Sequence, residues 1–174
     1  MKGYKLCVLG FPGVGKTAMT KRYETGEFID NYKTTIGLEI FTKNVEIEGE
    51  EVKLSIWDIT GTTKFETIEK DVFKDMHSCI IVFDITNRRS FDDLHIWTNR
   101  LIDNHDIISK YVIKILVGNK KDLNLSRQVY YDETREYWER SAIQTYETSA
   151  KTGENIEKVF SDLITDVYKS HNRR

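Results

Sequence analysis

Short apolar runs alternate along the chain with segments of helical periodicity. The runs at 79–85 and 112–118 are nearly continuous in apolar residues, which is typical of strands covered on both faces. Shorter runs at 4–10 and 145–148 predict two more strands. Because strands alternate with helical segments, the pattern predicts a parallel sheet with helices on both faces. Helices are expected over about 16–24, from Asn87 or Ser90 onward, and over about 132–141 and 154–168.

Two further runs, 39–47 and 52–58, lie on either side of the turn EGEE and predict a hairpin. The hairpin adds one antiparallel strand at an edge, so we expect an α/β fold with a mostly parallel sheet of six strands. No repeat, linker or low-complexity tract divides the sequence. We therefore expect a single domain over residues 1–174.

The composition is that of an ordinary soluble globular protein: of 174 residues, 39% are hydrophobic and 31% are charged. The net charge of −2 gives no bulk attraction to nucleic acid or anionic lipid. No apolar stretch is long enough to span a bilayer, and the C-terminal KSHNRR has no cysteine for prenylation. We expect a cytoplasmic protein that would reach a membrane only through a lipidated tail absent from this chain. Cys7 and Cys79 lie in apolar runs and are expected to be reduced core residues, with a disulfide as the alternative.

The stretch GFPGVGKT, residues 10–17, matches the pattern G-x-x-x-x-G-K-[ST] between a predicted strand and a predicted helix. In such a loop, backbone N–H groups bind phosphate, the lysine adds a charge and the hydroxyl suits Mg²⁺. Pro12, the only proline of the chain, has no N–H to donate, but it precedes the expected donors. Its ring is expected to crowd the space beside a terminal phosphate. The expected donors are Gly13, Val14, Gly15, Lys16, Thr17 and Ala18.

Two other segments offer groups for a metal and a terminal phosphate. In IWDITG, Asp58 ends a predicted strand, and a carboxylate there can hold Mg²⁺ through water. Gly61 follows three residues later, where the absence of a side chain lets its N–H approach a γ-phosphate closely. Thr35, in YKTTIG, is a candidate for a second hydroxyl on the metal, although an ordinary loop threonine would look the same.

The segment GNKKD, residues 118–122, follows an apolar strand and offers groups that can recognise guanine. The Asp122 carboxylate can accept both the N1–H and the N2–H₂ of that base. Adenine would leave the carboxylate desolvated and unpaired, which disfavours an ATP-using P-loop kinase or ATPase. The Lys120 stem can lie along the base, and Asn119 can tie this segment to the phosphate loop. In ETSAK, the Ala150 N–H can reach the guanine carbonyl.

In their order and spacing, these motifs resemble the nucleotide motifs of the Ras superfamily of small GTPases: GFPGVGKT, TTIG, WDITG, NKKD and TSAK. Within the superfamily, IGLEI, KLSIWD, KFETI and IIVFDITNRRSF are most similar to the Rab branch. The resemblance implies a three-layer P-loop NTPase fold, the small G domain, and a GTP/GDP switch with Mg²⁺ in vesicular trafficking. It also implies effectors, exchange factors and TBC-type activating proteins as partners. With a prenylated tail, the expected location is the cytosolic face of endomembranes.

The resemblance assigns roles to further residues. Thr35 and Gly61 hold two flexible segments against the γ-phosphate, and Thr35 joins Thr17 and Asp58 as a metal ligand. Phe28 packs edge-on to the base, and Tyr32 covers the phosphates. The residues expected at the base are Asn119, Lys120, Asp122, Ser149, Ala150 and Lys151, and those expected to act in hydrolysis are Lys16, Thr35, Gly61 and Thr62.

The sequence departs from the family where the family usually reads WDTAGQE, because this chain reads WDITGTT. Thr62 stands where a glutamine orients the attacking water, and a threonine hydroxyl is too short to contact both water and phosphate. Together with Pro12, this predicts very slow intrinsic hydrolysis. Two alternatives remain open: a switch that activating proteins rescue by supplying a glutamine, and a scaffold that stays loaded with GTP.

A second departure concerns the partner-binding surface. Rab proteins usually present three aromatic residues there, and in this chain Ile40 and Val72 stand in two of those places. Alternation along the hairpin places Trp57 on the face opposite to the apolar one, next to Ile40. We expect an exposed patch, with cover by a loop of the same chain as the alternative.

Overall fold

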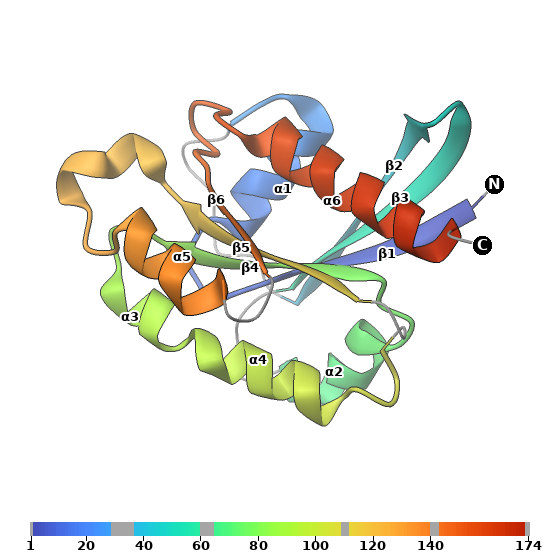
Figure 1. Ribbon diagram of the computed structural model, residues 1–174, viewed down its shortest axis with the longest axis horizontal. Helices are drawn as coiled ribbons and strands as arrows, with labels where there is room; N and C mark the ends of the chain where they lie inside the picture. Colours follow the sequence, from blue (N-terminus) through green and yellow to red (C-terminus); the bar gives the residue numbers. More distant parts are fainter. Residues whose placement is uncertain (1, 29–36, 60–64, 109–111, 140–142, 173–174) are drawn as a thin grey trace.

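The computed structural model describes residues 2–28, 37–59, 65–108, 112–139 and 143–172 of the chain (Figure 1). Within these ranges, six strands form one sheet in the order β2-β3-β1-β4-β5-β6. All neighbouring pairs are parallel except β2 and β3, which are antiparallel. The predicted sheet and its antiparallel edge strand are confirmed. The strands are β1 (Lys2–Leu9), β2 (Leu38–Ile47), β3 (Glu50–Ile59), β4 (Ser78–Asp84), β5 (Ile113–Asn119) and β6 (Gln144–Glu147).

Helices cover both faces of the sheet, which confirms the three-layer arrangement (Figure 1). One face carries α1 and α6, and the other carries α2, α3, α4 and α5. A 3-10 helix, η1 (Lys121–Ser126), directly follows β5. The helices are α1 (Lys16–Thr25), α2 (Phe65–Phe73), α3 (Arg88–Asp92), α4 (Leu94–Asp103), α5 (Tyr131–Glu139) and α6 (Ile156–Asn172).

The helix boundaries differ from the sequence expectation in three places. Of the two expected starts, the structure has Asn87, whose side chain caps α3 by accepting a hydrogen bond from the Ser90 N–H. The helix stops after five residues, and α4 begins two residues later. The short helices α2 and η1 were not predicted, because so few turns give a weak periodicity. The last helix runs on to Asn172, whose side-chain amide donates to the Tyr4 hydroxyl at 3.0 Å.

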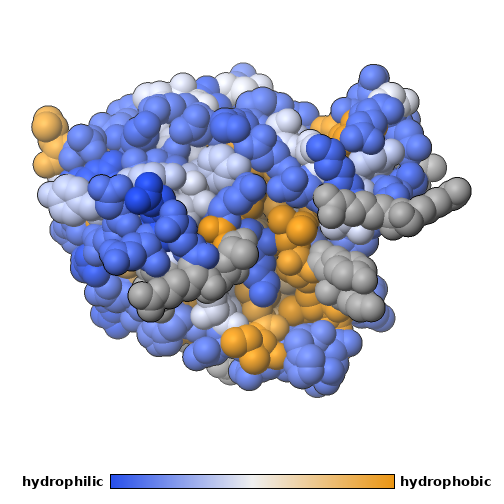
Figure 2. All heavy atoms as spheres, viewed as in Figure 1, coloured by the Kyte–Doolittle hydropathy of each residue, from blue (hydrophilic) through white to orange (hydrophobic). Residues whose placement is uncertain are grey.

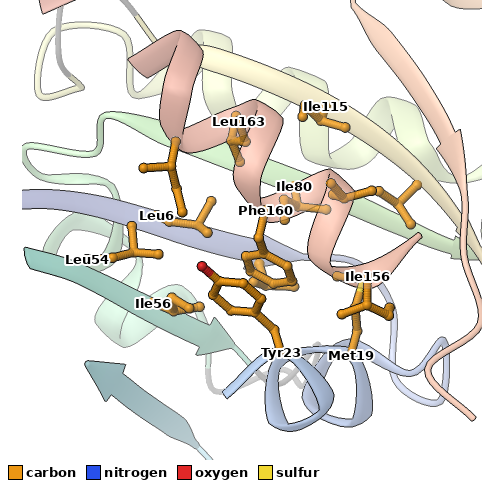
Figure 3. Close-up of a cluster of buried hydrophobic side chains, with 14 of the residues drawn as sticks. Leu6, Met19, Tyr23, Leu54, Ile56, Ile80, Ile115, Ile156, Phe160 and Leu163 are labelled. Carbon is orange, nitrogen blue, oxygen red and sulfur yellow. The ribbon is translucent and has the colours of Figure 1, made fainter. Parts of the chain in front are cut away.

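The core between the sheet and the α1–α6 layer is built around an aromatic pair (Figure 3). The rings of Tyr23 and Phe160 are stacked, with centroids 4.1 Å apart. Met19 of α1 and Leu163 of α6 extend this core along the two helices. On the sheet side, this core is formed by buried side chains of the central strands, among them Leu6, Leu54, Ile56, Ile80 and Ile115.

The opposite face of the sheet has a second core, which contains Trp97 of α4 and Trp138 of α5. Cys7 and Cys79 are register partners on β1 and β4, fully buried in this core. Both thiols are free, as expected, and burial raises the pKa of Cys79 to about 12. Neither cysteine is therefore a reactive thiolate at neutral pH.

The expected exposed patch on the hairpin side is corrected by the structure. Val72 is fully buried in the second core, so it contributes nothing to a surface. Trp57 is half-buried, and the ammonium group of Lys5 lies 3.7 Å from the centroid of its ring. Ile40, the register partner of Trp57, is 50% exposed as predicted. The prediction failed for Val72 because α2, which turns that residue inward, was not foreseen.

Polar residues cover most of the face shown in Figure 2. Among the helices of the described residues, none combines the length and the apolar character needed to cross a bilayer.

Candidate functional site

The sequence motifs within the described residues gather at the carboxyl ends of the strands, where ligands bind in open α/β sheets. The loop between β1 and α1 contains three glycines with positive φ, namely Gly10 at 144°, Gly13 at 82° and Gly15 at 96°. A Cβ at Gly10 would lie 2.4 Å from the Val82 carbonyl oxygen, and one at Gly15 would lie 2.3 Å from Asn119 Nδ2. Gly10 and Gly15 therefore have no room for a side chain, because the loop packs closely against β4 and the end of β5.

Lys16, the first residue of α1, turns back over this loop. Its Nζ donates to the carbonyl oxygens of Gly10 and Phe11 at 2.8 and 2.9 Å. Only 6% of the residue is exposed, and burial lowers the pKa of its ammonium group to about 8. The remaining N–H of the ammonium group can therefore serve an anion held by the loop.

Asp58, near the end of β3, places a buried carboxylate beside the start of α1. The Thr17 hydroxyl donates to Asp58 Oδ2, while Oδ1 has no hydrogen-bond partner among the described residues. Burial raises the pKa of Asp58 to about 6, against the opposing effects of Thr17 and Lys16. A carboxylate and a hydroxyl side by side are oxygen ligands of the kind that Mg²⁺ prefers, and the unpartnered Oδ1 is a place for the ion or its water. The residues present fit a magnesium ion.

Asn119 joins the phosphate loop to two other segments. Its Nδ2 donates to the Val14 carbonyl oxygen at 3.0 Å. Its Oδ1 accepts from the Thr148 hydroxyl at 3.1 Å and from the Ala150 N–H at 3.2 Å. The predicted link between this asparagine and the phosphate loop is therefore present. The Ala150 N–H, expected to face a base, is here shared with Asn119.

The loop after Asn119 presents an open carboxylate. Asp122 is exposed, and its Oδ1 accepts from the Ser149 hydroxyl at 2.6 Å. Lys120 adopts a left-handed backbone conformation, and its Nζ lies 2.7 Å from Asp84 Oδ2 at the end of β4. The structure thus brings the NKKD and TSAK segments together.

Arg22 of α1 contributes to the same region, although its sequence context gave no signal for it. Its Nε donates to the Ala150 carbonyl oxygen at 2.9 Å, and its Nη2 donates to the Lys151 carbonyl oxygen. Its Nη1 reaches the Gly26 carbonyl oxygen, just before Phe28. Phe28 is partly buried against the α1–α6 core. Asp84 and Thr148 were likewise missed, because only the folded sheet brings them to Lys120 and Asn119.

Four predicted site residues lie outside the described residues, namely Tyr32, Thr35, Gly61 and Thr62. Gly13, Val14, Gly15, Lys16, Thr17 and Ala18 lie in or directly after the loop between β1 and α1, as predicted.

Comparison with known proteins agrees with this geometry. A sequence profile described as the Ras family matches residues 5–169. The chain is 38% identical to the Ras-related protein Rab-1C of Dictyostelium discoideum, over 95% of this chain and 81% of that protein. It is 35% identical to the GTP-binding protein YPT1 of Saccharomyces cerevisiae, over 96% and 80% of the two chains. It is 34% identical to the Ras-related protein Rab-13 of Bos taurus, over 98% and 83%. The chain belongs to the Ras family of small GTPases, and its similarity to these relatives places it with the Rab proteins.

Proposed function

We propose that residues 1–174 act as one G domain, a Rab-like switch in vesicular trafficking that binds GTP and GDP with Mg²⁺ and hydrolyses GTP slowly unaided. The observation that carries the proposal is the presence of one carboxylate at each end of the site. Asp58 is buried beside Thr17 at the phosphate end, and Asp122 is open beside Ser149 at the base end. The Ras family match and the Rab relatives support the same function.

At the phosphate end, the N–H groups of residues 13–18 would bind the phosphates, and Lys16 would add the positive charge. Thr17 and Asp58 would hold Mg²⁺ together with Thr35, and the ion would neutralise phosphate charge. The lowered pKa of Lys16 refers to the protein alone, since a bound anion favours the charged form. Gly61 would donate its N–H to the γ-phosphate.

At the base end, Asp122 would accept from the N1–H and N2–H₂ of guanine. The stem of Lys120, fixed at its end by Asp84, would cover one face of the ring, and Phe28 would pack against its edge. Ala150 would offer its N–H to the guanine carbonyl. Ser149 would orient Asp122, and Lys151 would complete the rim of the base site.

Slow hydrolysis is proposed because of the side chains near the γ-phosphate. Thr62 cannot place a water as a glutamine does, and the ring of Pro12, within the phosphate loop, would take space beside the γ-phosphate. Single-turnover hydrolysis of Mg·GTP by the purified chain tests this point. A rate equal to that of Rab proteins with the glutamine would refute it. Resistance to every activating protein would instead favour the GTP-loaded scaffold.

Two measurements test nucleotide binding itself. Chromatography of the nucleotide released by denaturation should show GDP or GTP, with GTP indicating impaired turnover. Asp122→Asn should shift the preference from GTP to xanthosine triphosphate, because the amide donates where the carboxylate accepts. Asp132→Asn, an exposed change in the first turn of α5, is the matched control and should leave the preference unchanged. A preference for adenosine nucleotides in the unmodified chain would overturn the proposal.

A further inference from the structure

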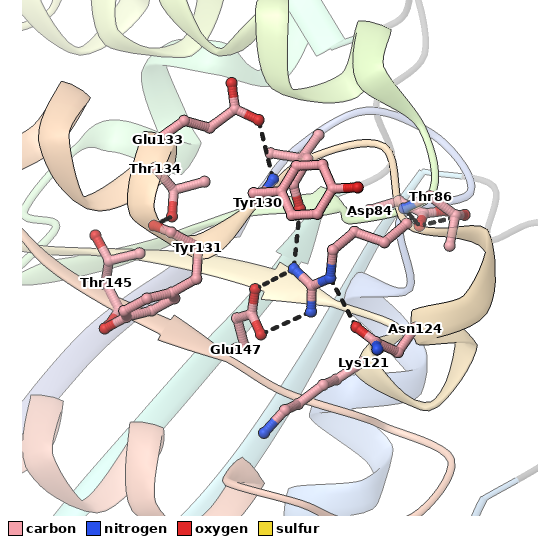
Figure 4. A network of polar contacts seen from close by, with 12 residues as sticks. Asp84, Thr86, Lys121, Asn124, Tyr130, Tyr131, Glu133, Thr134, Thr145 and Glu147 are labelled. Carbon is pink, nitrogen blue, oxygen red and sulfur yellow. Dashed lines mark hydrogen bonds and ion pairs between the residues drawn. The ribbon is translucent and has the colours of Figure 1, made fainter.

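A mostly buried ion pair connects the two segments of the proposed base site (Figure 4). Arg127 directly follows η1, and Glu147 is the last residue of β6. The guanidinium group binds the carboxylate through two bonds, Nη1–Oε1 at 2.5 Å and Nη2–Oε2 at 2.9 Å. The two side chains are only 12% and 11% exposed. A buried fork of this kind fixes distance and direction together, which a single surface contact does not.

The same guanidinium group also binds the chain on its own side of the site. Its Nε donates to Asn124 Oδ1 at 2.7 Å, and its Nη1 donates to the Val129 carbonyl oxygen at 2.9 Å (Figure 4). Through one rigid planar group, Arg127 is therefore hydrogen-bonded to three segments: to η1, to the residues that follow η1, and to β6. Its pKa is raised by the hydrogen bond to Glu147, so the group stays charged.

The position of this ion pair in the sequence relates it to guanine recognition. Asp122 lies in η1, two residues before Asn124, and Ser149 lies two residues after Glu147. These two segments also meet through the hydrogen bond from Ser149 to the exposed Asp122, and through a backbone hydrogen bond from the Lys121 N–H to the Thr148 carbonyl oxygen at 2.9 Å. The hydrogen bond at the exposed Asp122 carboxylate fixes only one distance, whereas the buried fork fixes both the distance and the direction between the two segments.

We propose that Arg127 is a positioning residue for guanine recognition, which holds the Asp122 and Ser149 segments at the separation that the base needs. The inference rests on the proposed function and deepens it. It assigns part of the base selectivity to a residue that does not contact the nucleotide. Loosening this fork lets the Asp122 carboxylate move away from the base edge, where its two hydrogen bonds depend on alignment.

The test compares GDP with inosine diphosphate, whose base lacks the 2-amino group. The unmodified chain should prefer GDP, because the inosine base makes only one of the two hydrogen bonds with Asp122. Arg127→Gln should release GDP about tenfold faster, the equivalent of one weakened charged hydrogen bond. It should release inosine diphosphate with a smaller acceleration, so the preference for GDP should fall about threefold or more. Arg127→Lys keeps the charge but not the two-point contact, so its release rates should lie between those of the unmodified chain and those of Arg127→Gln.

The matched control is Arg100→Gln. Arg100 Nη1 pairs with Glu69 Oε2 at 2.7 Å, with side chains 27% and 17% exposed, and joins α4 to α2 on the other core. This change should lower stability in urea unfolding without changing the preference for GDP over inosine diphosphate. The control separates loss of a partly buried ion pair from loss of alignment at the base.

Release is measured by loading every variant with a fluorescent GDP or with a fluorescent inosine diphosphate and displacing each with unlabelled GDP in excess. Failure of the unmodified chain to bind GDP would overturn the proposed function. If the unmodified chain binds GDP, an unchanged preference in Arg127→Gln would overturn only the role of Arg127. An equal acceleration of the release of both diphosphates would also overturn the role of Arg127. Where Arg127→Gln does not fold, Arg127→Lys decides in the same way.

Discussion

Replacing Gly15 with alanine should damage the site at the point where its two halves meet. Gly15 has a left-handed backbone with φ 96°, and a Cβ built on it lies 2.3 Å from Asn119 Nδ2. That nitrogen donates to the Val14 carbonyl oxygen at 3.0 Å in a buried position. The alanine must therefore push away the side chain that joins the phosphate loop to the base-side loops.

Two costs contribute to the expected loss of stability. A residue with a Cβ in the left-handed region costs about 1–2 kcal/mol. Displacing Asn119 leaves buried polar groups unpaired, which costs about 1–3 kcal/mol more. We expect Gly15→Ala to lower the free energy of unfolding by about 2–5 kcal/mol. Gly13→Ala is the matched control, because Gly13 has φ 82° but no atom within 4 Å of its built Cβ, so only the first cost applies.

Urea unfolding of the nucleotide-free chain in EDTA measures both variants without the stabilising effect of a bound ligand. A double mutant isolates the contact. In the background of Asn119→Ala, Gly15→Ala should cost no more than Gly13→Ala does in the unmodified chain. The reasoning is refuted if Gly15→Ala and Gly13→Ala cost the same, or if the cost of Gly15→Ala does not depend on Asn119.

Three other predictions concern catalysis, packing and pH. Thr62→Gln should raise single-turnover GTP hydrolysis about tenfold or more, and an unchanged rate would show that the threonine is not what limits hydrolysis. Phe160→Ala should lower the free energy of unfolding by about 3–5 kcal/mol, because it removes a fully buried ring stacked on Tyr23. Phe160→Leu should lose less, and equal losses in urea unfolding would contradict this account. Burial and the nearby His171 lower the pKa of His77, so folding favours the neutral ring, and this contribution to stability is present above the ordinary pKa of 6.5 and lost as the pH falls below it. Between about pH 7.5 and 5 the unmodified chain should lose more stability than His77→Gln, and parallel losses would exclude His77 as the cause.

The sheet and the nucleotide motifs could be predicted because their signals are local. A strand such as β4, buried along its whole length, must be apolar at every position but its polar ends, and that run is visible in one sequence. The phosphate loop is visible for a similar reason, since Gly10 and Gly15 have no alternative residue at their backbone angles and contacts.

The missing parts depend on contacts between residues far apart in the chain. Arg22 lies in a helix and Arg127 in a loop, and neither position differs in sequence from an exposed arginine. Their roles appear only when α1 meets residues 150–151 and when η1 meets β6. Trp57 was misjudged for the same reason, because Lys5 of the neighbouring strand covers part of its ring.

Several hydrogen bonds join the phosphate half of the site to the base half. Asn119 reaches from the end of β5 to Val14 in the phosphate loop, and it also accepts from Ala150. Arg22, on the helix that directly follows the phosphate loop, donates hydrogen bonds to the carbonyl oxygens of Ala150 and Lys151. When a ligand occupies one half, the loops of the other half are therefore already in place, and their ordering on binding costs little further conformational entropy. This arrangement favours a ligand with a base and phosphates on one molecule over either fragment alone, because the second contact becomes intramolecular. We therefore expect the affinity for a whole guanosine diphosphate to depend on the hydrogen bonds that join these loops, and not only on the groups that would touch the nucleotide.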